Sequence, residues 1–250
     1  MLIREGVFLV TGAASGLGRA AAAELLRRGA RVAALDLKTP LPFTGAESHS
    51  LVLQADVTDE ESVRTAVSRT VEHFGALHGC INCAGIITPS PVLTGTEPSS
   101  AAIFRRVIEV NLTGTYVVIC HTAAAILRTQ PGDRDKERGV IVNIASIRAF
   151  ESGANGAAYG SSKSGVAGMT LGLARELSVH RIRVACIAPG LMDTPMFNGL
   201  PTDATAAFLQ GVPYPKRTGH PNEFADLTCH VIENEYLNGT TIRLDGGLRV

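Results

Sequence analysis

A tyrosine and a lysine four residues apart, Tyr159 and Lys163 in the segment YGSSK, could carry out acid–base chemistry. In a helix this spacing places both side chains on one face, one turn apart. A permanent cation beside a phenol stabilises the phenolate, so we expect the pKa of Tyr159 to shift from about 10 towards neutrality. Tyr159 would then serve as a general acid and base. The pattern alone is common by chance, and an ordinary surface pair is the alternative.

Two polar residues are candidates for the same chemistry. Ser146 directly follows the apolar run VIVNIA and could hold a substrate oxygen by a hydrogen bond. Asn111 lies within a long stretch of helical period, where asparagine is a poor helix former. We therefore expect Asn111 to kink that helix towards the site. Together with Tyr159 and Lys163, these residues form the predicted catalytic set.

A glycine-rich segment, TGAASGLG, lies between a strand-like run and a helix-like run near the start of the chain. There Gly12 permits a tight turn, Gly16 lets the backbone approach a pyrophosphate, and Gly18 lets the helix pack closely on the strand. The strand-to-helix context makes a dinucleotide site the favoured interpretation, with a glycine-rich turn without a ligand as the alternative. The predicted cofactor contacts here are Gly12, Ser15, Gly16, Leu17 and Gly18.

Asp36 closes the second apolar run, where a carboxylate can accept hydrogen bonds from both hydroxyls of an adenosine ribose. The same charge would repel a 2′-phosphate. Ser15 and Leu37 offer no cation and only Lys38 lies nearby, so the sequence favours NAD(H) over NADP(H). A turn-forming aspartate is the alternative. Further cofactor contacts are expected from Asp56, Val57, Asn82, Ala84 and Gly85.

Short apolar runs alternate with longer stretches of helical period along the chain, which is typical of βαβ units. Parallel strands joined by right-handed crossovers form a sheet that helices cover on both faces. We therefore predict an α/β fold: a Rossmann-type, doubly wound, seven-stranded parallel sheet in a single domain over residues 1–250. The predicted strands are residues 7–11, 31–36, 51–55, 77–82, 140–145, 182–187 and 241–244.

The composition limits the possible partners. Hydrophobic residues make up 45% of the 250 residues and charged residues 18%, which is enough apolar side chain for a large core. The 23 Lys and Arg balance the 23 Asp and Glu, so no net field attracts nucleic acid or an anionic membrane. The most apolar stretch, residues 111–127, is interrupted by polar residues and does not suggest a membrane span.

The five cysteines are too few and too scattered to form a disulfide framework. We expect free thiols in a reducing compartment: the cytoplasm, or the mitochondrial matrix if a presequence is absent from this chain. Cys80 and Cys83 form a C-x-x-C, but no second pair follows, so core packing is favoured over zinc or redox chemistry. No metal site is expected.

The segment from about residue 191 to residue 216 holds four prolines and is too long for an ordinary connection. It follows the sixth predicted strand at the sheet edge where ligands of such folds bind. We interpret it as a substrate lid. Met192, Met196 and Phe208 are expected to line an apolar pocket for the substrate, while docking of these side chains on the core is the alternative.

Over essentially its whole length the chain resembles the short-chain dehydrogenase/reductase family. TGAASGLG, Asp36, NCAG, Asn111, Ser146, the Tyr159/Lys163 pair and the Pro189–Gly190 turn carry the resemblance. It implies that Tyr159 is the proton donor and acceptor, Lys163 its activator and a ribose ligand, and Ser146 the positioner of the carbonyl. It also implies that Asn111 anchors a water relay, that Pro189, Gly190 and Thr194 contact the nicotinamide end, and that the protein is a homotetramer. Cys83 departs from the pattern, since the family usually has asparagine there.

Within the family, the C-terminal half is similar to the short-chain 3-hydroxyacyl-CoA dehydrogenases, which also oxidise hydroxysteroids. The strings RGVIVNIAS, IRVACIAPGLMDTP and IENEYLNGTTIRLDGG carry this similarity. It implies an NAD-dependent oxidation of a small-molecule secondary alcohol, an acyl-CoA or a steroid-like compound. A reductase of 3-oxoacyl carriers that uses NADPH is the close alternative, and Asp36 counts against it. A non-catalytic NAD(H)-binding sensor is the other, and it would not need the four catalytic residues.

Overall fold

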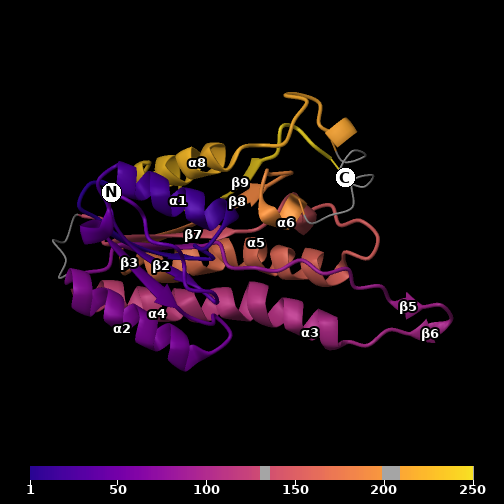
Figure 1. Ribbon diagram of the computed structural model, residues 1–250, viewed down its shortest axis with the longest axis horizontal. Helices are drawn as coiled ribbons and strands as arrows, with labels where there is room; N and C mark the ends of the chain where they lie inside the picture. Colours follow the sequence, from indigo (N-terminus) through magenta and orange to yellow (C-terminus); the bar gives the residue numbers. More distant parts are fainter. Residues whose placement is uncertain (130–135, 199–208, 250) are drawn as a thin grey trace.

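The computed structural model describes residues 1–129, 136–198 and 209–249. Its centre is a seven-stranded parallel sheet in the order β3-β2-β1-β4-β7-β8-β9 (Figure 1). The predicted fold class and number of sheet strands are confirmed. The strands are β1 (Val7–Thr11), β2 (Arg31–Asp36), β3 (Ser50–Gln54), β4 (Gly79–Asn82), β7 (Gly139–Ile144), β8 (Ile182–Pro189) and β9 (Thr241–Leu244).

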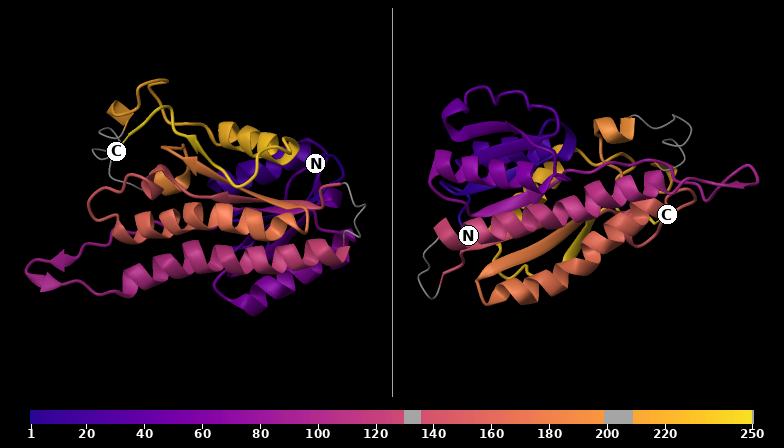
Figure 2. Two further views of the ribbon diagram at one scale, coloured as in Figure 1. Left: turned by 180° about the vertical axis from the view of Figure 1, so that it is seen from behind. Right: turned by 90° about the horizontal axis from the view of Figure 1, so that it is seen from below.

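Helices cover both faces of the sheet (Figures 1 and 2). Helices α1 and α8 pack together on one face, and α2, α3, α4 and α5 form the layer on the other. Central strands such as β1, β4, β7 and β8 are buried along their whole length, which explains their continuous apolar sequences. The helices are α1 (Gly16–Arg27), α2 (Glu60–Phe74), α3 (Ala102–Ile108), α4 (Gly114–Thr129), α5 (Ala157–Ser178), α6 (Pro195–Asn198) and α8 (Pro221–Glu233).

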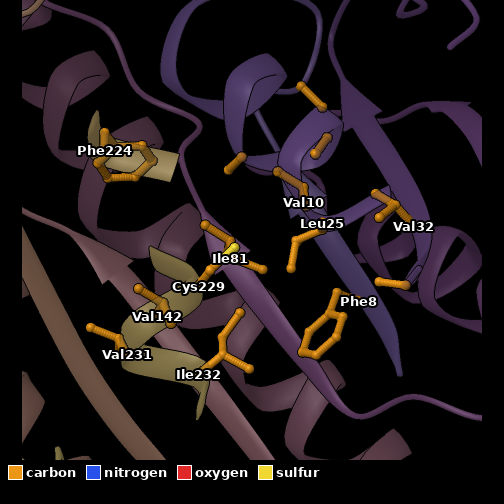
Figure 3. Packing of buried hydrophobic residues seen from close by; sticks show 14 of the residues in the cluster. Phe8, Val10, Leu25, Val32, Ile81, Val142, Phe224, Cys229, Val231 and Ile232 are labelled. Atoms are coloured by element: carbon orange, nitrogen blue, oxygen red, sulfur yellow. The ribbon is translucent and has the colours of Figure 1, made fainter. Parts of the chain in front are cut away.

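The core between the sheet and the α1/α8 layer is built from side chains of both (Figure 3). Phe8 and Ile81 from the sheet belong to one cluster with Leu25 of α1 and Phe224 of α8, and all four are fully buried. Burying a side chain of this size contributes about 1.5–3 kcal/mol. The free thiol of Cys229 packs in the same cluster, as expected for a core cysteine.

The sequence predicts one long helical rod over about residues 101–128 with a kink at Asn111, and the structure divides it into three parts. Between α3 and α4, residues Glu109–Thr113 form a π-helical turn, η2, which contains Asn111. The extra residue in such a turn changes the direction of the side chains that follow, and π turns are frequent at functional sites. The expected local distortion at Asn111 is therefore present, as a π turn.

The same rod, Ala102–Thr129, is the one described segment that is long and apolar enough to cross a membrane. Within the fold, 56% of its most apolar window is buried. It packs against α2 and α5, so its hydropathy is accounted for by its place in the helical layer.

The sheet positions a site at its carboxyl edge. Strand β1 lies between β2 and β4, so the chain crosses to opposite sides of β1 and leaves a crevice at the ends of these strands. An element that the sequence did not predict extends beyond this edge: a hairpin of β5 (Leu93–Thr94) and β6 (Glu97–Pro98), which is exposed and projects past α3 (Figure 1).

Candidate active site

A cavity of about 910 Å³ runs along the carboxyl edge of the sheet. It extends from the end of β2 past the glycine loop to the start of α5 and the segment after β8. The structure thus brings residues from most of the predicted motifs into one space. The predicted residues that line it are Gly12, Ser15, Gly16, Leu17, Gly18, Asp36, Asp56, Val57, Ala84, Gly85, Ser146, Tyr159, Lys163, Pro189, Gly190, Met192, Thr194 and Met196.

The glycine loop makes a cradle whose backbone faces the cavity. Gly12 has a φ of +68°, and a Cβ there would lie 2.8 Å from the backbone of Cys83 and Ala84. The N–H of Ala84 donates to Thr11 Oγ1 at 3.1 Å, which ties the loop to the end of β4. Ser15 is the N-cap of α1, but its side chain makes no capping hydrogen bond. The first N–H groups of α1 are thus left for an anionic ligand, and the cradle fits a dinucleotide pyrophosphate.

The carboxylate of Asp36 is held in place at the end of β2. The N–H of Ala14 donates to Oδ2 at 3.0 Å and that of Lys38 donates to Oδ1 at 3.2 Å. Each carboxylate oxygen keeps a lone pair for a further donor. Asp56 lies beside it in the cavity wall, where a hydrogen bond from the Thr58 N–H lowers the pKa of the Asp56 carboxyl. This end of the cavity therefore fits an adenosine.

Lys163 is buried one turn after Tyr159 on α5. Its Nζ donates to the carbonyl of Ile144 at 2.7 Å and lies 5.9 Å from the centroid of the Tyr159 ring. Burial lowers the pKa of Lys163 to about 8. The predicted pair is thus present on one helix face, with the ammonium anchored to the end of β7 beneath the phenol ring.

The predicted effect of Lys163 on the pKa of Tyr159 is wrong for the chain alone. Burial raises the pKa of Tyr159, while its hydrogen bond with Ser146 and the charge of Arg148 act in the opposite direction. Desolvation of the phenolate is the larger effect, and the Lys163 ammonium is directed at the carbonyl of Ile144. Ser146 itself accepts a hydrogen bond from the N–H of Arg148 at 3.2 Å.

Asn111 does not line the cavity but holds part of its wall in place. Its Oδ1 accepts from the N–H of Ile86 at 2.8 Å, and its Nδ2 donates to the Ile86 carbonyl at 2.9 Å and to Ser162 Oγ at 3.0 Å. The side chain is fully buried. It therefore fastens the loop after β4 to α5, next to Lys163.

Asn82 does not occupy the predicted position in the cofactor site. It is 2% exposed, is not part of the cavity wall, and donates through Nδ2 to Asn143 Oδ1 at 2.9 Å. Asn82 is registered with Asn143 on the neighbouring strand β7, so both side chains point to the same face of the sheet and bond each other. Direct contact passes to its neighbours Cys83, Ala84 and Gly85.

The start of the segment after β8 forms part of the cavity wall. Met192 is buried and pairs with Gly219 through a parallel bridge, while Met196 on α6 is 44% exposed and lines the cavity. The methyl group of Thr194 lies across from Gly16, where a Cβ would lie 3.4 Å from it. Phe208 lies outside the described residues, as does the middle of the predicted lid, residues 199–208.

Among the wall residues that the sequence did not predict as site residues are Cys83, Arg106 and Arg148. The hydropathy pattern gives no signal for the two arginines, since nothing local tells which face of a helix turns to a ligand. Burial raises the pKa of both Cys80 and Cys83 to about 12, which keeps these thiols protonated. In the part of the chain that the structure describes, no three His, Cys, Asp or Glu side chains could hold a metal ion together.

Comparisons with known proteins agree with this geometry. The sequence profile described as short chain dehydrogenase matches residues 6–205. The 3-hydroxyacyl-CoA dehydrogenase type-2 of Homo sapiens is 42% identical over 253 residues, which is 98% of this chain and 95% of that protein. Its namesake in Drosophila melanogaster is 40% identical over 254 residues, 100% of this chain and 99% of that protein.

A solved structure is similar across the same length. The crystal structure of 3-hydroxyacyl-CoA dehydrogenase type-2 from Mycobacterium avium superposes with a TM-score of 0.87 and 33% sequence identity. The match covers 98% of this chain and 96% of that chain. The chain therefore belongs to the short chain dehydrogenase family, whose oxidoreductases use a nicotinamide dinucleotide.

Proposed function

We propose that the protein oxidises the hydroxyl of a 3-hydroxyacyl-CoA to the 3-oxoacyl-CoA, with NAD as the hydride acceptor. The observation that carries this proposal is one continuous cavity that runs from Asp36 through the glycine cradle to Ser146 and Tyr159. The acyl-CoA substrate is supported by the names of the relatives, which match this chain almost end to end. Hydroxysteroids are the second substrate class to test.

NAD is the proposed cofactor because of Asp36. Its carboxylate lies at the end of the cavity that fits an adenosine, and the N–H groups of Ala14 and Lys38 hold it there. A ribose with two free hydroxyls can donate to it, whereas the 2′-phosphate of NADP would meet a like charge in a partly desolvated site. The side chain of Lys38 is a nearby cation that would attract a 2′-phosphate. The cofactor assay tests whether the repulsion by Asp36 outweighs this attraction.

The residues of this chain would supply the proton chemistry and the positioning. The Tyr159 oxygen takes the proton of the substrate hydroxyl, and Ser146 holds the substrate oxygen by a hydrogen bond. Lys163, whose Nζ lies 5.9 Å from the centroid of the Tyr159 ring in the same cavity wall, would bind the nicotinamide ribose. A bound nicotinamide supplies the acceptor for the hydride. Ile86, Met192 and Met196 line the substrate half and limit access of water.

The test is a spectrophotometric assay at 340 nm with NAD or NADP. Purified protein is given 3-hydroxybutyryl-CoA, a longer 3-hydroxyacyl-CoA and a 17β-hydroxysteroid with the oxidised cofactors, and a 3-oxoacyl carrier thioester with NADH or NADPH for the reducing direction. We expect turnover of the acyl-CoAs with NAD and at least about tenfold lower kcat/KM with NADP. Asp36→Ala should reduce this preference, while Glu72→Ala on the exposed face of α2 should leave it unchanged.

Other outcomes assign the alternatives. A preference for NADPH with the carrier thioester would identify a carrier reductase and overturn the assignment to NAD. Tight binding of NADH without turnover of any of these substrates would identify a non-catalytic sensor.

A further inference from the structure

One charged side chain of the cavity has no part in the proposed chemistry so far. The adenosine end of the cavity holds Asp36, Lys38 and Asp56, and Arg106 of α3 bonds Thr58 beside it. Lys163 lies next to the ring of Tyr159. Among the described residues that line the cavity, Arg148 is the remaining charge. It follows Ser146 by two residues and is half-buried.

The backbone around Arg148 is held firmly. Residues Ile147–Ala149 form a short 3-10 turn, η3, whose first N–H groups are capped by Ser146, since Ser146 Oγ accepts from the N–H of Arg148. The carbonyl of Ala149 accepts a hydrogen bond from Ser164 Oγ at 2.6 Å, one residue after Lys163 on α5. The turn that carries Arg148 is therefore tied both to Ser146 and to the helix of Tyr159 and Lys163.

The guanidinium itself lies close to two features of the site. Its charge acts on the phenol of Tyr159, so the two groups are within electrostatic range. On its other side it lies against Gly153, where a Cβ would be 2.5 Å from Nη1. An alanine at this position would displace the guanidinium, because Gly153 has no positive φ and the obstacle is the end of a flexible side chain.

The cavity wall also holds the apolar side chains of Ile86, Ile147, Met192 and Met196, while Thr88 and Asn155 are its uncharged polar members on the loops after β4 and before α5. A guanidinium has five N–H donors in a planar fork, which suits an acyl oxygen or a carboxylate. A substrate that brings such an oxygen next to its carbinol would be held with the hydroxyl at Ser146 and Tyr159. A neutral secondary alcohol without an acyl group would gain nothing from Arg148.

We propose that Arg148 is a specificity-determining residue that binds the acyl oxygen adjacent to the reacting carbinol, either a thioester carbonyl or a carboxylate. This inference rests on the proposed function for the site, because it specifies which secondary alcohols the site accepts. It also makes free 3-hydroxy acids a second substrate class of the same site.

The experiment compares Arg148→Met, Arg148→Lys and Gly153→Ala with the wild type. The substrates are 3-hydroxybutyryl-CoA, free 3-hydroxybutyrate and cyclohexanol, a secondary alcohol without an acyl group. We expect Arg148→Met to lower kcat/KM about 10- to 100-fold for the acyl substrate and less than about threefold for cyclohexanol. Arg148→Lys should recover part of the loss, and Gly153→Ala should reproduce a smaller, equally selective loss.

The matched control is Arg69→Met on the exposed face of α2, which removes the same charge far from the cavity and should change none of these ratios. A second readout is the pH profile of kcat/KM. Loss of Arg148 should move its acidic limb to higher pH, because a cation near Tyr159 favours the phenolate. The acyl substrate whose kcat/KM falls more in Arg148→Met shows whether Arg148 binds the thioester carbonyl or the carboxylate.

Binding experiments separate this inference from the proposed function. Wild-type protein that does not oxidise 3-hydroxybutyryl-CoA would defeat the proposed function. In that case the role of Arg148 is tested by ligand binding alone. Quenching of NADH fluorescence by acetoacetyl-CoA, acetoacetate and cyclohexanone is compared between wild type and Arg148→Met, which needs no turnover. It is overturned if Arg148→Met weakens all ligands equally, as a structural role would, or weakens neither acyl ligand.

Discussion

Asn111 shows how a single buried side chain organises this site. Its amide uses both ends on the backbone of Ile86 and a third contact on Ser162, so the loop after β4 and helix α5 keep a fixed separation. That separation sets the distance between the cofactor end and the proton-transfer end of the cavity. The geometry of the cavity thus depends on side chains, such as that of Asn111, that do not face the ligand.

His78 has a similar role at the other end of the strands and makes stability depend on pH. Its Nδ1 accepts from the N–H of Val7 at 3.0 Å, which requires an unprotonated Nδ1. Burial lowers the pKa of His78, and the charge of Arg31 adds to this effect. Since the unfolded chain then binds the proton more tightly, stability is full above a pH of about 6.5 and falls as the pH falls through the lowered pKa of His78.

We predict that His78→Gln flattens this acid dependence, because a glutamine oxygen can accept from Val7 without titrating. His78 is half-buried, so solvent screening keeps its contribution below the single-proton limit of about 1.4 kcal/mol per pH unit. The measurement is urea unfolding between pH 5 and 8 at fixed protein concentration. His180→Gln at the exposed end of α5 is the control, and an unchanged slope in His78→Gln would contradict the prediction.

Residue types at fixed spacings were predictable, and side-chain directions were not. Tyr159 and Lys163 are on one face of a helix because the spacing requires it. Whether Asn82 turns to the ligand or to Asn143 depends on the strand register, which only the folded sheet defines. The raised pKa of Tyr159 likewise follows from burial by distant segments.

At the scale of elements, the segment after β8 is held at both ends. Met192 pairs with Gly219, and Val212 packs with Ile147 and Leu248 in a small buried cluster. Between these anchors, Met196 on α6 contributes to the cavity wall. On this arrangement we propose that the segment selects the length of the acyl chain.

We predict that Met196→Ala changes the chain-length preference more than it changes activity on the shortest substrate. Each methylene that loses its apolar contact costs about 0.8 kcal/mol, or roughly a fourfold loss in kcat/KM per carbon. The measurement is a series of 3-hydroxyacyl-CoAs from four to sixteen carbons. Val179→Ala, at the exposed end of α5, is the control. Identical relative kcat/KM values in Met196→Ala and wild type would assign the segment to structure alone.

Most of the elements can be predicted from the sequence, because the apolar runs of the seven strands and the helical period of the main helices are clear and regular. The π turn η2 and the β5/β6 hairpin do not. The turn depends on the packing of Asn111 between two other elements, and the hairpin has strands of two residues, too short for any periodicity.

At the scale of the whole molecule, the helical layer of α3, α4 and α5 exposes apolar side chains. Phe104, Tyr116 and Leu171 are 42%, 50% and 46% exposed. Apolar side chains gathered on adjacent helices favour an interface with further copies of the chain. We propose a homotetramer that buries this layer.

We predict a tetrameric mass for the wild type in analytical ultracentrifugation at micromolar concentration. Introducing charge with Tyr116→Glu and Leu171→Glu should shift the distribution to smaller species, because a buried unpaired carboxylate is costly. Leu41→Glu, an exposed position after β2, is the control. A wild-type protein that sediments as a monomer would contradict the proposal.

The central claim is that the cavity is a dehydrogenase site in which Tyr159 transfers the proton. Its most direct test is Tyr159→Phe, which removes one oxygen and keeps the ring. We predict at least about a thousandfold fall in kcat/KM with 3-hydroxybutyryl-CoA, while NADH binds within about threefold of wild type in a fluorescence titration. Retention of a tenth of the wild-type rate with NADH binding intact would contradict it.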